Sequence, residues 1–211
     1  MSYFPSPSPF SFYRAADKPR TGWCLSVWVE PVTDAFKEFG YAYQIFHTSN
    51  RNSVPVAATG RIQAGSSSEA FLKTVLLCLK RLLEASEAVD ANIIEDFVFR
   101  MSEGLSIPVY DKGLVSCLNR GVMDALCRNN VWPDGSPLPY AELWQRLRVL
   151  ETELGSPVTF WDAASHSRFS LQSEVVEMCR SVAASRTGLD SFYCWGIPSP
   201  TPVLDDFLVG L

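Results

Sequence analysis

The sequence has no apolar run long enough to cross a bilayer. A membrane-spanning helix needs about 20 consecutive apolar residues, and the longest candidate, Ala70 to Leu83, is interrupted by Lys73, Lys80 and Arg81. The first residues also lack the basic segment followed by an apolar stretch that is typical of a secretory signal. We therefore expect no membrane partner and an intracellular protein, cytoplasmic or nuclear.

Paired cysteine motifs are absent as well. The chain has six cysteines, but none are spaced as Cys-x-x-Cys, and several lie among apolar residues typical of a core. This spacing does not favour a zinc site. A secreted disulfide framework is not favoured either in a chain of 211 residues. We expect reduced thiols, in agreement with an intracellular protein.

Basic residues are not in excess. The formal net charge is −5 and the isoelectric point is about 5.1. A strong general nucleic-acid binder usually carries a basic face, so this balance argues against that class of protein. A nuclease is not excluded, because metal-binding carboxylates add negative charge of their own.

The distribution of proline separates a central domain from two terminal segments. Residues 1–20 contain four prolines and several serines, which predicts a flexible N-terminal tail. We assign residues 21–185 to one globular domain and residues 186–211 to an irregular C-terminal extension. Either tail could dock a protein partner, although for the apolar end, Leu204 to Leu211, we favour folding back onto the domain.

Hydrophobic periodicity predicts three strands, then alternating helices and strands. The short polar links between the first three strands are typical of antiparallel hairpins. Residues 66–68 are serines that can cap a long amphipathic helix. The predicted strands are 23–30, 40–47, 54–63, 105–110 and 158–162. The apolar face of the long helix runs from Leu72 to Leu83, and the other predicted helices are 112–128, 140–154 and 171–185, with a short helix favoured over 90–103.

Three motifs in the second half of the chain are specific when taken together. An aspartate follows a predicted strand in Tyr110-Asp111-Lys112. A helix reads Ala-Glu-Leu-Trp-Gln-Arg-Leu over 141–147, and a loop reads Ser-His-Ser-Arg-Phe over 165–169. These segments resemble the T-D-S, D-L-W-Q-R-L and G-H-S-G-F motifs of the type 1 ribonuclease H family. The resemblance covers roughly 160 residues.

This resemblance implies both a fold and an activity. The implied fold is a ribonuclease H-like α/β domain, a mixed five-stranded sheet with its first three strands antiparallel and helices on both faces. The implied activity is that of a metal-dependent endoribonuclease, which cleaves the RNA strand of RNA–DNA hybrids with Mg²⁺ or Mn²⁺ as cofactor. Hard cations of this kind need oxygen ligands. An RNA–DNA hybrid or another nucleic acid would be the partner.

The resemblance also implies a set of catalytic residues. Glu69 at the head of the long helix and Asp111 at the end of a strand match two acidic metal ligands of the family. Glu177 falls on the family's fourth acidic position, one residue further from His166 than is usual, and Glu30 on the first strand is offered for the first. His166 would assist proton transfer. Whether Glu30 faces the site is open, because a slip of one residue turns a strand side chain to the opposite face.

Departures from the family pattern keep two alternatives open. Glutamate replaces aspartate at the positions of Glu30 and Glu177, and Lys112 follows Asp111 where a small polar residue is usual. A shift of about 1 Å in a catalytic group can cost much of the rate. The first alternative is a catalytically decayed domain that serves as an interaction or structural module. The second is a nuclease of the wider superfamily with another substrate.

Each acidic residue also has a purely structural explanation. Glu69 suits the first turn of a helix, where a negative charge is stabilised by the helix dipole. Asp111 can cap the helix that follows it. The positions of Glu69 and Asp111 relative to each other in the folded chain distinguish these structural roles from metal binding.

Overall fold

A computed structural model describes residues 22–32, 37–47, 56–88, 104–163, 180 and 191–194. The strands are β1 (Trp23–Pro31), β2 (Glu38–His47), β3 (Val56–Gln63), β4 (Leu105–Val109), β5 (Val158–Asp162) and β6 (Ser191–Cys194). The helices are α1 (Ser67–Ala88), α3 (Lys112–Asn119), α4 (Val122–Cys127) and α5 (Ala141–Leu154). The helix predicted over 90–103 lies outside the described residues, as do both tail ends and all of the helix predicted over 171–185 except Arg180.

The strands form one mixed sheet in the order β5-β4-β1-β2-β3-β6. β2 is antiparallel to β1 and β3, whereas β4 is parallel to β1 and β5 is parallel to β4. Among the first five strands, β2 is therefore the one that runs against the other four. The predicted mixed α/β sheet with three antiparallel strands at its start is confirmed.

A sixth strand extends the predicted sheet at its β3 edge. β6 pairs antiparallel with the first half of β3, from Val56 opposite Cys194 to Thr59 opposite Ser191. It comes from the segment 186–211 that we expected to be irregular. Four residues are too few to show strand alternation in a sequence, so the pairing partner and not the local pattern defines this strand.

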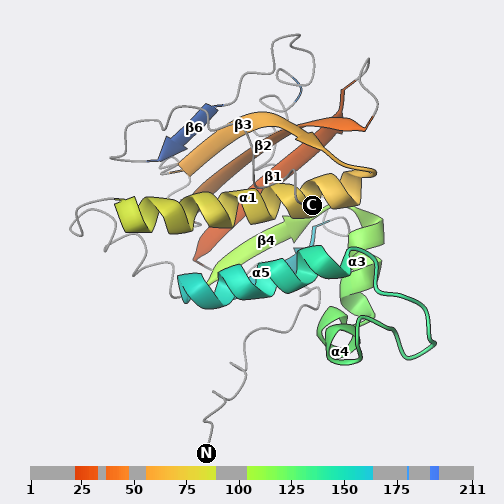
Figure 1. Ribbon diagram of the computed structural model, residues 1–211. Coiled ribbons are helices and arrows are strands. Elements are labelled where there is room, and N and C mark those ends of the chain that lie inside the picture. The colour runs from red at the N-terminus through yellow and green to blue at the C-terminus, as the bar shows by residue number, and fades with distance from the viewer. Residues whose placement is uncertain are drawn as a thin grey trace, which may run out of the picture.

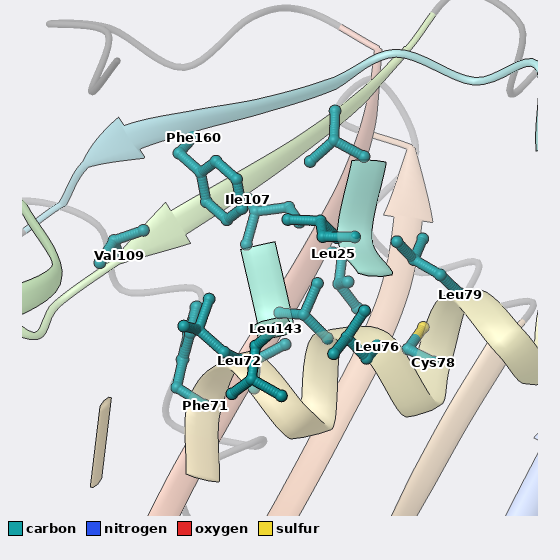
Figure 2. Close-up of a cluster of buried hydrophobic side chains, with 14 of the residues drawn as sticks. Leu25, Phe71, Leu72, Leu76, Cys78, Leu79, Ile107, Val109, Leu143 and Phe160 are labelled. Carbon is teal, nitrogen blue, oxygen red and sulfur yellow. The ribbon is translucent and has the colours of Figure 1, made fainter. Parts of the chain in front are cut away.

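Helices α1 and α5 lie side by side on one face of the sheet (Figure 1). Their apolar sides meet the odd-numbered residues of β1 and β4 in the core. Figure 2 shows Leu25 and Ile107 of the sheet close to Leu72 and Leu76 of α1, with Leu143 of α5 beside them. This packing holds the first turn of α1 against one end of the central strands.

The opposite face of the sheet is also covered. All five residues of β4 are buried, although alternate side chains of a strand point to opposite faces. Trp161 of β5 is fully buried, and its neighbour Phe160 packs edge-on against Trp144 of α5. The sheet therefore carries a core on both faces, as expected for a mixed sheet of this class.

The helix predicted over 112–128 is two short helices. α3 ends before Arg120, and Gly121 precedes α4 with a left-handed φ of 84°. A Cβ at Gly121 would lie 2.9 Å from the carboxylate of Asp124. Glycine adopts this left-handed conformation readily, and the conformation interrupts the helix. The apolar pattern alone predicts a continuous helix because it does not encode this turn.

Two further expectations concern cysteine and the membrane. Within the described residues, Cys24, Cys78, Cys117 and Cys127 are free thiols, and two of them are buried. No helix in the part of the chain that is described has the length and apolar character to cross a membrane.

Candidate functional site

The first turn of α1 is built by reciprocal capping. The Ser66 hydroxyl oxygen accepts a hydrogen bond of 3.2 Å from the Glu69 backbone N–H, and Glu69 Oε2 accepts one of 2.8 Å from the Gly65 backbone N–H. These two bonds satisfy one amide donor that the helix start leaves without a partner, that of Glu69, and the amide of Gly65 just before the capping residue. A side chain at position 65 would crowd this carboxylate, because a Cβ there would lie 3.1 Å from Glu69 Oε2. Glu69 thus has a structural role in starting the helix.

Asp111 starts a second helix at the end of β4. Its Oδ1 accepts a hydrogen bond of 3.0 Å from the Leu114 backbone N–H, which caps α3. Its Oδ2 accepts hydrogen bonds from the hydroxyls of Ser67, at 3.1 Å, and Ser68, at 3.0 Å. Gly113 leaves room for this carboxylate, since a Cβ there would lie 3.0 Å from Oδ1. The side chain of Asp111 is therefore fixed against the head of α1.

These contacts bring two of the predicted site residues to the same end of the sheet. Glu69 belongs to the first turn of α1, and Asp111 is bonded to the two serines that precede it in that turn. Both side chains lie on the face of the sheet that α1 covers. The sequence placed each of them at a helix head, and the contact between the heads of α1 and α3 joins them.

The carboxylate of Glu69 lies in a positive environment. Lys73 Nζ is 2.9 Å from Glu69 Oε1, one helical turn further along α1. Burial raises the pKa of Glu69, but the hydrogen bonds from Lys73 and Gly65 and the charges of Lys73 and Lys37 outweigh it and lower this pKa. The side chain of Glu69 is therefore ionised at neutral pH.

Glu30 lies on the other face of the sheet. Leu25, Val27 and Val29 pack into the core under α1, so the residues between them point to the opposite face. Trp28 accordingly packs against Tyr110, with ring centroids 6.0 Å apart. Strand alternation thus answers the question that the sequence left open, and it separates Glu30 from the face of Glu69 and Asp111.

Glu30 also has a cationic neighbour of its own. Its Oε2 is 3.4 Å from Arg180 Nε. The remaining two predicted site residues, His166 and Glu177, lie outside the described residues. The structure therefore brings together two of the five predicted residues and places a third on the opposite face.

Lys73 and the serines of α1 were not predicted as parts of the site. The side chain of Lys73 is 11% exposed, and its ammonium also donates a hydrogen bond of 2.9 Å to the Gln63 carbonyl oxygen. The i,i+4 spacing of Glu69 and Lys73 is the signal that a sequence offers for such a pair. The Ser66 and Tyr140 hydroxyls, 2.8 Å apart, join the heads of α1 and α5 and have no local sequence signal.

The donor set has the chemistry of a site for a hard divalent cation, but it is small. Carboxylates from two elements lie at the same end of the sheet, Asp111 against the serines of the first turn of α1 and Glu69 in that turn, and Mg²⁺ and Mn²⁺ prefer such ligands. No group of three or more histidine, cysteine, aspartate or glutamate side chains is arranged for metal binding among the described residues. Glu69 and Asp111 could hold a cation if the contacts that now occupy their oxygens were exchanged.

Solved structures with a similar course of the backbone include three proteins with ribonuclease H or reverse transcriptase in their names. LC11-RNase H1, in complex with an RNA/DNA hybrid, matches with 9% identity and a TM-score of 0.47, over 75% of this chain and 94% of that chain. The PFV RNase H domain matches with 10% identity and a TM-score of 0.48, over 79% and 93% of the two chains. The foamy viral protease-reverse transcriptase, in complex with dsDNA, matches with 7% identity and a TM-score of 0.49, over 75% and 90%.

No protein-family model matches the chain, and no curated protein matches it. The assignment of the fold rests on the chain's own strand order, strand directions and helix packing. The chain has a ribonuclease H-like fold.

Proposed function

We propose that this chain is a divergent metal-dependent nuclease that cleaves the RNA strand of RNA–DNA hybrids. The observation that carries the proposal is the convergence of Glu69 and Asp111 at the heads of α1 and α3. It is supported by the order of the motifs around Asp111 and the helix 141–147, which resemble those of ribonuclease H. The fold alone would not support an activity, because one fold serves many functions.

Glu69 and Asp111 would be the central metal ligands, and the mechanism that the resemblance implies uses two ions, Mg²⁺ or Mn²⁺. When bound, one ion would lower the pKa of an attacking water and the other would stabilise the leaving oxygen of a phosphodiester. Glu177 as an outer ligand and His166 as a proton shuttle remain predictions from the sequence. Glu30 was predicted as an outer ligand at the first acidic position, and its place on the opposite face makes it the weakest member of this set.

The chain's own residues hold the Asp111 carboxylate in place. The Leu114 amide fixes one oxygen, and the hydroxyls of Ser67 and Ser68 fix the other. A carboxylate held from two sides loses little conformational freedom when it takes up a ligand. Hydroxyl donors can also rotate away from Oδ2 without any change in the backbone. The serines therefore orient Asp111 and still leave it accessible to a cation.

A second function, an interaction or structural module without activity, is favoured by two observations. The ammonium of Lys73 contacts Glu69 Oε1, the carboxylate oxygen that a metal ion would otherwise contact. Glu30, the residue offered for the first acidic position, is on the opposite face and is near Arg180. In this alternative, Glu69 and Asp111 serve only to cap helices.

Cleavage of a labelled RNA–DNA hybrid, with Mg²⁺ and Mn²⁺ titrated separately, distinguishes these functions. We expect metal-dependent cleavage by the wild type and none by Asp111→Asn, which removes a ligand charge but keeps a capping side chain. Asp134→Asn is the matched control, because Asp134 caps a local turn through Ser136 and is remote in sequence from the site. Equal rates for wild type and Asp111→Asn would refute the nuclease. A folded wild type that cleaves nothing with either metal would favour the module.

A further inference from the structure

The ammonium of Lys73 is an integral part of the Glu69 environment. Lys73 Nζ lies 2.9 Å from Glu69 Oε1 and donates a hydrogen bond of 2.9 Å to the carbonyl oxygen of Gln63. It therefore joins the first turns of α1 to the end of β3. The side chain of Lys73 is 11% exposed and that of Glu69 is 25% exposed, so water screens this pair only in part.

A second lysine–glutamate pair in the same helix shows what an ordinary surface pair looks like. Lys80 and Glu84 have the same i,i+4 spacing, but their charged atoms are 3.4 Å apart and their side chains are 30% and 58% exposed. Exposed pairs of this kind contribute little and exchange readily with water. The Lys73 pair is shorter and less exposed, and the Gln63 carbonyl also holds the Lys73 ammonium.

A fixed ammonium at this distance opposes a metal ion in two ways. It takes up an oxygen lone pair that a ligand would offer, and it repels a doubly charged cation at close range. Glu69 Oε2 already accepts a hydrogen bond from the Gly65 amide, so each oxygen of this carboxylate has one partner and keeps a second lone pair. A divalent ion that binds Glu69 therefore shares the carboxylate with the ammonium of Lys73 or displaces it.

We propose that Lys73 is an internal cation that competes with a divalent metal ion for Glu69, and so sets the metal concentration at which the site fills. This inference rests on the proposed function, since it concerns the same two carboxylates. Lys73 acts through Glu69 and is a positioning residue. Its effect is a property of metal binding and does not require that the bound site be active.

Calorimetry with manganese on the full chain tests the inference without a substrate. Lys73→Gln removes the charge and keeps an amide that can donate to the Gln63 carbonyl. We expect this variant to bind Mn²⁺ at least about tenfold more tightly than the wild type. Lys73→Arg, which keeps the charge, and Lys80→Gln, which removes a charge from the exposed pair, should both bind like the wild type. If Lys73→Gln does not fold, Lys73→Met serves for the same comparison.

The site of any gain in affinity is checked by a second substitution. Combining Lys73→Gln with Asp111→Asn should abolish the gain, because Asp111 would be the other ligand. The inference is overturned if Lys73→Gln binds Mn²⁺ no more tightly than the wild type, or if the gain survives Asp111→Asn. A gain that depends on Asp111 but brings no hybrid cleavage supports the inference and contradicts the nuclease. If the wild type cleaves the hybrid but Lys73→Gln binds Mn²⁺ no more tightly, the nuclease is supported and the inference about Lys73 is contradicted.

Discussion

Asp111 is predicted to combine a structural and a chemical role, and two substitutions at this position separate them. Asp111→Ala removes the cap of α3 and leaves the hydroxyls of Ser67 and Ser68 without their acceptor. Asp111→Asn keeps an oxygen that can accept from the Leu114 amide. Its side-chain NH₂ group would then face the hydroxyls of Ser67 and Ser68. These hydroxyls can rotate and accept hydrogen bonds from it.

The magnitude follows from the contacts. Loss of an N-cap costs about 1 kcal/mol, and each of the two partly solvated hydroxyl bonds adds roughly 0.5–1 kcal/mol. We therefore expect Asp111→Ala to lower the free energy of unfolding by about 2–3 kcal/mol. Asn is as good an N-cap as Asp, so Asp111→Asn should cost less than about 1 kcal/mol. For a chain of this size, the alanine variant should then melt roughly 5–10 °C below the wild type.

Urea unfolding and thermal melting followed by circular dichroism measure these differences. The measurements should be made at pH 7 without divalent metal, so that metal binding does not add to the stability of the wild type. An alanine variant within 0.5 kcal/mol of the wild type would show that the contacts between Asp111 and the head of α1 are not formed. Equal destabilisation by Asn and Ala would contradict the assignment of the cap.

Two further predictions concern the pH dependence of stability and the edge of the sheet. The folded pKa of Glu69 is lowered, because the hydrogen bonds and positive charges at its carboxylate outweigh its burial. Ionised Glu69 therefore stabilises the fold above its unfolded pKa, and this stabilisation is lost as the pH falls through the folded pKa. Glu69→Gln should accordingly flatten the acid side of a stability–pH curve, and an unchanged curve would contradict the Lys73–Glu69 pair. Removal of residues 191–211 takes away β6 and leaves Val56 to Thr59 of β3 without a partner strand. We expect this truncated chain to aggregate in light-scattering measurements, whereas a chain shortened only after Ser199 keeps β6, and equal scattering by the two would refute the edge-protection role.

The sequence by itself determined most of the secondary structure and the class of the fold. The helices α1 and α5 have long periodic patterns, serines mark the start of α1, and Gly155 marks the end of α5. The five strands are short apolar runs that turn-rich or polar segments separate. It also identified Glu69 and Asp111 as residues at the heads of helices. These features are local, because spacing along one element decides which face is apolar and which residue can cap it.

Where local signals were short or absent, the prediction went less far. β6 has four residues and exists through its pairing with β3. The break at Gly121 depends on a left-handed φ that interrupts an otherwise helical pattern. In both cases the backbone conformation depends on a neighbour or a turn that hydrophobic periodicity does not encode.

Only the tertiary structure decided which carboxylates meet. Packing of α1 across β1, β2 and β3 brings the serines of its first turn to Asp111, which is more than 40 residues away in the sequence. The register of β1 turns Glu30 to the opposite face, a choice that one residue of slip would reverse. The fold also seats Lys73 between Glu69 and the end of β3, where its charge bears on any metal at this place. Charges and hydrogen bonds act over a few ångströms in space, so the properties of this site follow from the contact between elements and not from the sequence of either element alone.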